Sequence, residues 1–164
     1  MTSRICASIA AVGLIVIGAS PVYADLPKDG KYDVTLCFGG PLPTMAHSDK
    51  LVAGVLDLYG PMVSNLPNGG LYHLNGIRCT GVWAVIDGVY QENGYCETTD
   101  PDGDKQFGKY SNTGSGGKWQ VMNGTGKYAG MTASGSYAAV GQVASQGPGT
   151  LLNCNRAVGT YRLK

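Results

Sequence analysis

The chain has 164 residues, of which 43% are hydrophobic and only 14% are charged, so we expect one folded domain rather than a disordered chain. Twelve Lys and Arg residues balance eleven Asp and Glu residues, and this balance argues against a nucleic-acid partner. The 26 glycines have no three-residue period, which excludes collagen, and their number disfavours long helices.

Residues 1–24 have the pattern of a secretory signal peptide. Arg4 precedes an apolar run, and a small residue, Ala24, ends the segment. The apolar run is shorter than the roughly 20 residues of a transmembrane helix, so we expect cleavage after Ala24 and no stable membrane anchor. The mature protein would then be a single domain over residues 25–164, secreted or periplasmic.

Nine stretches of the mature chain have apolar side chains at alternate positions, which indicates β-strands. Gly or Pro interrupts nearly every stretch of ten residues, which disfavours helices. Residues 42–46 and 65–70 are expected to be loops. About eight or nine short strands are typical of a β-sandwich or an antiparallel barrel. The expected strands cover residues 31–38, 51–59, 70–74, 77–86, 89–97, 107–110, 118–122, 133–143 and 157–163.

Four cysteines remain after removal of the signal peptide, and an even number in a small exported domain predicts two disulfides. Asp87-Gly88 joins two apolar runs and predicts a two-residue type I′ hairpin turn, whose register places Cys79 directly opposite Cys96. The pair falls at a non-hydrogen-bonded position, where the backbones are close enough for a disulfide. By elimination Cys37 pairs with Cys154, which would join the first strand to the region before the last strand and hold a barrel closed.

Three carboxylates, Asp100, Asp102 and Asp104, alternate along one tight turn, as the first three calcium ligands of an EF-hand do. The rest of the segment departs from that loop, because Lys105 stands where Gly is needed and Ser111 where the bidentate Glu is needed. We therefore expect a solvated hairpin turn, for which Asp, Pro and Gly are common residues, with calcium binding as the alternative. No other cofactor is expected.

The segment 124–130, Gly-Thr-Gly-Lys-Tyr-Ala-Gly, together with Ser-Gly-Ser-Tyr at 134–137, Asp-Gly-Asp at 102–104 and Gly-Lys-Trp at 117–119, resembles the allene oxide cyclase/dirigent-like barrels and their bacterial exported relatives. The resemblance covers residues 100–137. It implies an eight-stranded antiparallel barrel with a hydrophobic lumen. Plant members of this superfamily guide cyclisation or radical coupling in the lumen, often as trimers, so a homo-oligomer is possible, whereas many bacterial relatives have no assigned activity. No catalytic residue is carried over, because the acidic and basic residues do not align with the plant catalytic positions.

Five residues are candidates for lining such a lumen. His73 alternates with Tyr72 in an expected strand and could act there as an acid or base; a satisfied core or surface histidine is the alternative. Asp57 and Glu92 lie in expected strands, and either could face the lumen. The hairpin register places Glu92 opposite Trp83, which also fits an exposed cross-strand pair. The ten tyrosines and two tryptophans fit either an aromatic-lined pocket or ordinary packing.

Together these patterns predict an all-β protein, an antiparallel up-and-down barrel of eight to nine strands with two disulfides. We expect it to bind a small apolar or aromatic molecule in its lumen. One alternative is a cyclase- or isomerase-like enzyme whose acid or base is His73, Asp57, Glu92 or a tyrosine. The other is a structural or partner-binding exported protein with a packed interior. The lumen distinguishes the three functions: an apolar cavity favours binding, a cavity with converging polar groups favours the enzyme, and a filled interior favours the structural protein.

Overall fold

The computed structural model describes residues 26–114, 116–144 and 147–164, and the expected signal peptide lies outside them. The described residues form nine strands and one short 3-10 helix. No helix in this part of the chain has the length and apolar character needed to span a bilayer. The elements are β1 (Asp29–Pro41), β2 (Thr44–Ser48), β3 (Leu51–Ser64), β4 (Asn75–Ile86), β5 (Val89–Thr99), β6 (Lys105–Thr113), β7 (Gly116–Gly124), η1 (Gly126–Tyr128), β8 (Thr132–Gln142) and β9 (Thr150–Arg162).

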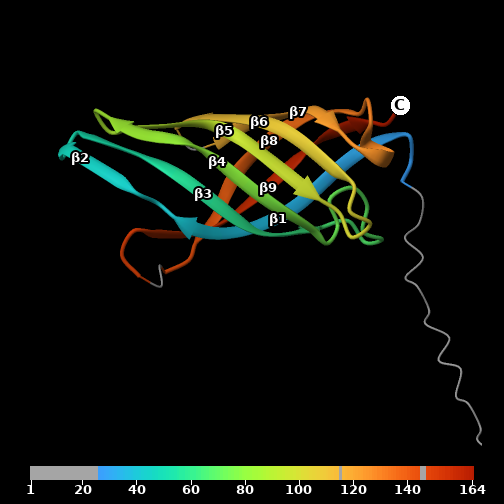
Figure 1. Cartoon of the computed structure of the whole chain (residues 1–164), viewed down its shortest axis with the longest axis horizontal. Coiled ribbons are helices and arrows are strands. Elements are labelled where there is room, and N and C mark those ends of the chain that lie inside the picture. Colours follow the sequence, from blue (N-terminus) through green and yellow to red (C-terminus); the bar gives the residue numbers. More distant parts are fainter. Residues whose placement is uncertain (1–25, 115, 145–146) are drawn as a thin grey trace, which may run out of the picture.

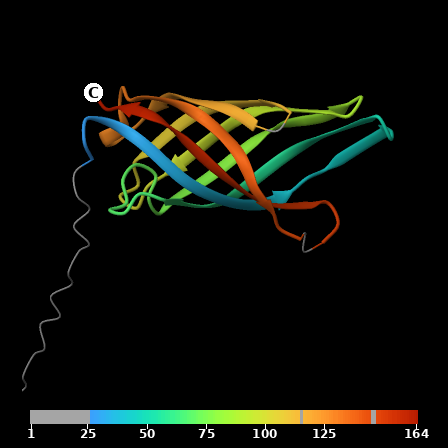
Figure 2. The same ribbon diagram turned by 180° about the vertical axis from the view of Figure 1, so that it is seen from behind.

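Eight of the strands close into an antiparallel barrel, as Figures 1 and 2 show from opposite sides. The strands follow the order β1, β9, β8, β7, β6, β5, β4, β3, and the second half of β3 pairs again with β1, for example at Val34 and Ser64. The first half of β3 pairs with the ninth strand, β2, which extends one end of the barrel. The predicted eight-stranded barrel is therefore confirmed.

Both predicted disulfides are present. Asp87 and Gly88 have φ values of 51° and 81°, as a type I′ turn requires, and the resulting register sets Cys79 opposite Cys96 with their Cα atoms 4.0 Å apart. Cys37 of β1 lies directly opposite Cys154 of β9, with a Cα–Cα distance of 4.1 Å. This second disulfide joins the first and last strands and so links the two ends of the closed sheet.

The expected strand over residues 70–74 is wrong. The segment is a turn, in which Tyr72 and Leu74 have φ values of 69° and 58°, outside the range of a strand. The turn points the side chains of Leu71 and Tyr72 into the barrel, where each is only 1% exposed, so that they fill one end. Short apolar runs are ambiguous because a buried turn and a buried strand have the same composition.

The expected loop over residues 42–46 is also wrong in part. Residues 44–46 belong to β2, although every β2 side chain is exposed. The strand exists because its backbone pairs with β3, from Thr44 and Gly54 to Ser48 and Leu51. Such pairing depends on a distant partner and not on an apolar pattern in the segment itself.

Candidate functional site

The barrel encloses a cavity of about 590 Å³. Alternate residues of each strand face inward, and those of β1 and β3 that line the cavity are aliphatic or aromatic. The volume lies within the range of small-molecule sites, and the wall is mostly apolar, as such sites require. The aliphatic lining residues are Val34, Leu36, Leu56, Leu58, Met62, Ile77, Ala139, Leu151 and Ala157.

Three aromatic side chains, Tyr32, Tyr72 and Trp119, form the floor of the cavity. Their rings meet edge to face, with centroids 5.2 Å apart for Tyr32 and Tyr72 and 5.6 Å apart for Tyr72 and Trp119. The indole Nε1 of Trp119 donates a hydrogen bond of 2.6 Å to the hydroxyl of Tyr32. Burial raises the pKa of Tyr32 to about 12 and that of Tyr72 well above its ordinary value, so both hydroxyls stay protonated. The Tyr72 hydroxyl is buried and has no hydrogen-bond partner among the described residues.

Glu92 of β5 brings a carboxylate into the same cavity, towards the end opposite the floor. Its Oε2 accepts a hydrogen bond of 2.6 Å from the hydroxyl of Tyr90, and its Oε1 accepts one of 2.7 Å from the hydroxyl of Tyr137. Burial and the neighbouring carboxylate raise the pKa of both tyrosines well above the ordinary value. The two hydroxyls therefore remain donors, and they hold the carboxylate in a fixed orientation.

A glycine allows Tyr137 to reach Glu92 across the sheet. Glu92, Asn112, Gly117 and Tyr137 are consecutive partners in one row across β5, β6, β7 and β8. A Cβ atom at Gly117 would overlap the ring of Tyr137, so the ring lies over the place where other residues have a side chain. The missing side chain thus permits a contact between strands that are not neighbours.

Two further polar atoms beside Glu92 have no hydrogen-bond partner among the described residues. They are the hydroxyl of Tyr110 and Oδ1 of Asn112, and both residues line the cavity. Asn112 lies directly opposite Glu92 in the sheet, and the Tyr110 ring contacts the Tyr137 ring at 6.4 Å between centroids. Because buried polar atoms are normally satisfied, these two atoms are unusual, and a small turn of either side chain would bring them to a ligand. We call Tyr90, Glu92, Tyr110, Asn112 and Tyr137 the Glu92 cluster.

The structure brings two of the five predicted residues, Tyr72 and Glu92, to the cavity wall. Trp83 lies opposite Glu92, as the hairpin register predicts, and stacks on Tyr90 with a centroid distance of 6.4 Å, although it is not a lining residue. His73 lies in the turn after β3 and does not line the cavity; its ring covers the side of Gly69 where a Cβ atom would be.

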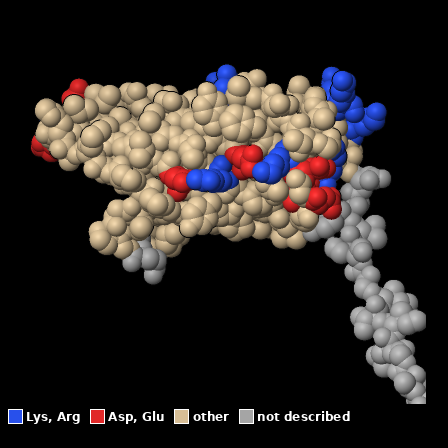
Figure 3. All heavy atoms as spheres, in the orientation of Figure 1, with Lys and Arg blue, Asp and Glu red and all other residues tan. Residues whose placement is uncertain are grey.

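Asp57 points out of the barrel. Its carboxylate accepts hydrogen bonds of 2.8 and 2.7 Å from Arg78, and both side chains are exposed. Glu97 and Lys105 form a second exposed pair. Charged side chains of both signs form a band across the face seen in Figure 3, and a few others lie at its edges. Leu56 and Leu58 flank Asp57 and line the cavity, so the alternation of the strand places Asp57 outside.

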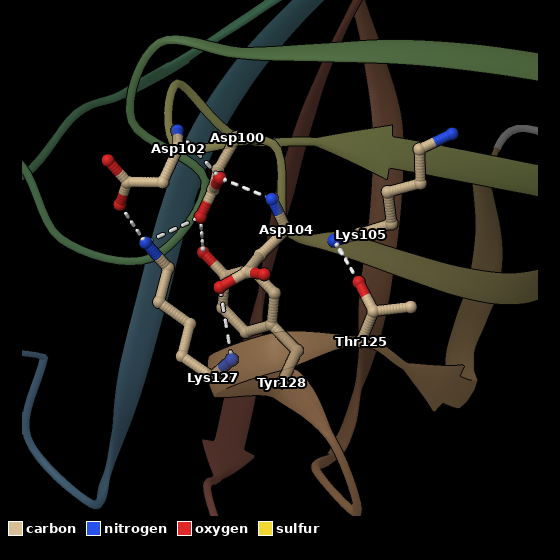
Figure 4. Close-up of polar contacts among 7 residues, drawn as sticks. All are labelled: Asp100, Asp102, Asp104, Lys105, Thr125, Lys127 and Tyr128. Atoms are coloured by element: carbon tan, nitrogen blue, oxygen red, sulfur yellow. Dashed lines mark hydrogen bonds and ion pairs between the residues drawn. The ribbon is translucent and has the colours of Figure 1, made fainter.

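The acidic turn already holds a positive charge of the protein itself (Figure 4). The ammonium group of Lys127 lies 2.6 Å from Asp100 and 2.5 Å from Asp102, whereas Asp104 accepts a hydrogen bond from the backbone N–H of Lys127. Within the described residues, no group of three or more His, Cys, Asp and Glu side chains could hold a metal ion. The lysine ammonium thus occupies the position between the carboxylates that a cation would need.

Asp100 is not solvated, in contrast to the expected turn, because its side chain is only 1% exposed. Its Oδ1 accepts hydrogen bonds of 2.9 Å from the backbone N–H groups of Asp102 and Asp104, and Oδ2 accepts one from the hydroxyl of Tyr128. Burial raises the pKa of Asp100, but the contacts with Lys127 and Tyr128 outweigh it, and the net shift is downward. The turn and the motif at 124–130 are therefore joined by one buried carboxylate.

Sequence reasoning did not identify Tyr32, Tyr90, Tyr110, Trp119 and Tyr137 as individual site residues. The sequence could have identified Tyr90, because this residue lies two positions before Glu92 in the same strand and so faces the same side of the sheet. Tyr110 and Trp119 pair across the short β6–β7 connection, whereas the positions of Tyr32 and Tyr137 depend on longer connections.

Comparison with protein-family models finds no match, and comparison with curated proteins finds none either. Among solved structures the fold is similar to that of a pterocarpan synthase dirigent protein, GePTS1. The TM-score is 0.52 with 9% sequence identity, and the match covers 90% of this chain and 99% of the other. At this identity the likeness shows a dirigent-like barrel fold.

Proposed function

We propose that the barrel binds a small, mainly apolar molecule in its lumen. The observation that carries the proposal is the cavity of about 590 Å³, with aliphatic walls, an aromatic floor and a few polar atoms at defined places. Sites for small molecules combine these same features. A packed interior would favour a structural or partner-binding protein. The described residues leave a cavity instead.

Fluorescence of N-phenyl-1-naphthylamine, an apolar dye that brightens in dry sites, tests this proposal. Ala157 lines the cavity and is 6% exposed, whereas the next residue, Val158, points outward and is 41% exposed. We expect the dye to brighten with the wild-type protein and with the control Val158→Phe, and Ala157→Phe to weaken binding about tenfold or more by filling the lumen. Equal binding by all three proteins would place the dye outside the lumen and contradict the proposal.

Native mass spectrometry of the protein from its own source provides an independent measurement. A co-purifying mass that Ala157→Phe does not retain would identify the occupant. Wild-type protein that carries no added mass and does not brighten the dye would contradict lumenal binding.

A second candidate function is an isomerase- or cyclase-like reaction in the same lumen, and the Glu92 cluster favours it. A carboxylate held by two hydroxyls can take a proton from one position of a bound molecule and, as the carboxylic acid, return the same proton at another position. The test is time-dependent conversion of the co-purified molecule, which Glu92→Gln should abolish while binding persists. Binding without conversion by the wild-type protein would leave the simple binding function.

Two disulfides in a small domain are typical of an oxidising compartment. The proposal is therefore a secreted or periplasmic protein, released by cleavage after Ala24. N-terminal sequencing of the mature protein should begin at Asp25. A chain that retains residues 1–24 would contradict this part of the proposal.

A further inference from the structure

The carboxylate of Glu92 has no cationic partner among the described residues. The cavity lining contains no Lys, Arg or His, and every ion pair of the described residues involves a different acid. The two hydrogen bonds that Glu92 accepts come from neutral hydroxyl groups. A negative charge in an apolar cavity attracts a positive charge more strongly than it would in water.

The surroundings of Glu92 are also suited to a cation. The rings of Tyr90, Tyr110 and Tyr137 line the cavity next to the carboxylate, and Trp83 stacks against Tyr90. Electron-rich ring faces attract ammonium groups, and such aromatic enclosures are a common means of recognising amines. The aromatic residues therefore add to the attraction of the carboxylate.

Unsatisfied acceptor atoms lie at the same level of the barrel. Oδ1 of Asn112 is buried without a partner, and Asn112 is the direct cross-strand neighbour of Glu92. The oxygen of Tyr110 is likewise unpartnered. An ammonium group has several N–H donors and no acceptor, so it complements the carboxylate and also these two oxygens once their side chains turn towards the lumen.

We propose that the lumen selects a cationic amphiphile, a molecule with an aromatic or aliphatic body and a protonated amine. The amine would pair with Glu92, and the body would lie against the aliphatic wall towards the floor formed by Tyr32, Tyr72 and Trp119. This inference rests on the proposed lumenal binding and names the chemical class of the ligand.

Three probes with one ring system and different charges test the proposal. They are 1-naphthylmethylamine, which is a cation at neutral pH, 1-naphthalenemethanol, which is neutral, and 1-naphthoic acid, which is an anion. By titration calorimetry we expect the wild-type protein to bind the amine about tenfold more tightly than the alcohol, because an ion pair and ring contacts add to the same apolar burial. The anion should bind more weakly than the alcohol.

Two charge-matched variants locate the effect. Glu92→Gln should reduce amine affinity to that of the alcohol and leave the alcohol unchanged. Asp57→Asn removes the same charge from the outer wall and should keep the full preference for the amine. Circular dichroism and the thermal midpoint of each variant show that it is folded.

The outcomes separate this inference from the proposed function. If the wild-type protein binds the alcohol as tightly as the amine, or if Glu92→Gln keeps the preference, the cationic ligand is ruled out. Lumenal binding then still stands if Ala157→Phe blocks the dye. If none of the three probes binds while the dye does, selection of amines is overturned and the apolar site remains.

Discussion

The hydroxyl of Tyr137 donates a hydrogen bond of 2.7 Å to Oε1 of Glu92, although the two residues lie on β8 and β5, with two strands between them. The ring of Tyr137 lies over Gly117 of β7, where the side chain of any other residue would block it. This contact along the inner face of the sheet connects the stability of the sheet to the geometry of the candidate site.

Gly117→Ala should therefore displace Tyr137 from Glu92. We expect the free energy of unfolding to fall by about 1–3 kcal/mol, because the methyl group overlaps the ring and forces it to move. Urea denaturation measures this change. Gly76→Ala is the matched control, since a Cβ atom there meets nothing closer than 4.0 Å. Equal effects of the two substitutions would contradict a specific clash with Tyr137.

Stability should fall in acid because of Asp33. The guanidinium of Arg156 and then the amide of Asn65 hold the Asp33 carboxylate and lower its pKa from 3.8 to about 2. A carboxyl whose pKa is lower in the folded protein stabilises the fold above its unfolded value, and this contribution is lost as the pH falls through the folded value. We expect the thermal midpoint of the wild-type protein to drop as the pH falls from 3.8 to about 2. The thermal midpoint of Asp33→Asn should drop less over the same pH interval. Asp49→Asn, in an exposed turn, is the control and should behave as the wild type.

Lys127→Met should leave the buried carboxylate of Asp100 without its cation. Removing one member of a buried pair is costly, but Lys127 is 37% exposed and solvent screens part of the interaction, so we expect a loss of about 1–3 kcal/mol. Urea denaturation of Lys127→Met, Asp100→Asn and the double variant gives the coupling energy. Lys50→Met, in the exposed turn before β3, is the control. Additive effects of the two substitutions would contradict a direct interaction.

Excess calcium should leave the thermal midpoint of the wild-type protein unchanged. The reason is that the Lys127 ammonium already lies between the carboxylates of Asp100 and Asp102. Melting curves in calcium and in chelator check this expectation. A midpoint that rises with calcium would show that the turn binds the ion after all.

The two disulfides should contribute unequally. Cys37–Cys154 spans 117 residues and Cys79–Cys96 spans 17, so loop-closure entropy predicts contributions of about 5 and about 3 kcal/mol. Unfolding of the variants Cys37→Ala/Cys154→Ala and Cys79→Ala/Cys96→Ala measures both. A larger loss from the Cys79–Cys96 pair would show that packing at the cavity wall outweighs chain entropy.

The amino-acid sequence alone determined the all-β class, the central hairpin and both disulfides, whereas the closed eight-stranded barrel was implied by the resemblance of residues 100–137 to dirigent-like barrels. These features follow from local information: alternation of apolar residues, a two-residue Asp-Gly turn with a single register, and the even number of cysteines. The same hairpin register predicted that Glu92 faces Trp83. The alternation of a strand also indicates which of its side chains face the lumen. Leu56 and Leu58 are apolar and flank Asp57, and this pattern places Asp57 on the outer face.

Only the tertiary structure decided which side chains meet in the lumen. Tyr90, Tyr110 and Tyr137 come together around Glu92 because the registers of β5, β6, β7 and β8 set Glu92 and Tyr137 in one row and the Tyr137 ring lies over Gly117. Tyr72 reaches the floor from a turn whose apolar composition is also that of a strand. The glycines serve as an example: their number predicted a protein rich in turns, but the position of Gly117 beneath a tyrosine ring follows from the pairing of three strands. Such pairings are set by packing over the whole barrel, which no single segment encodes.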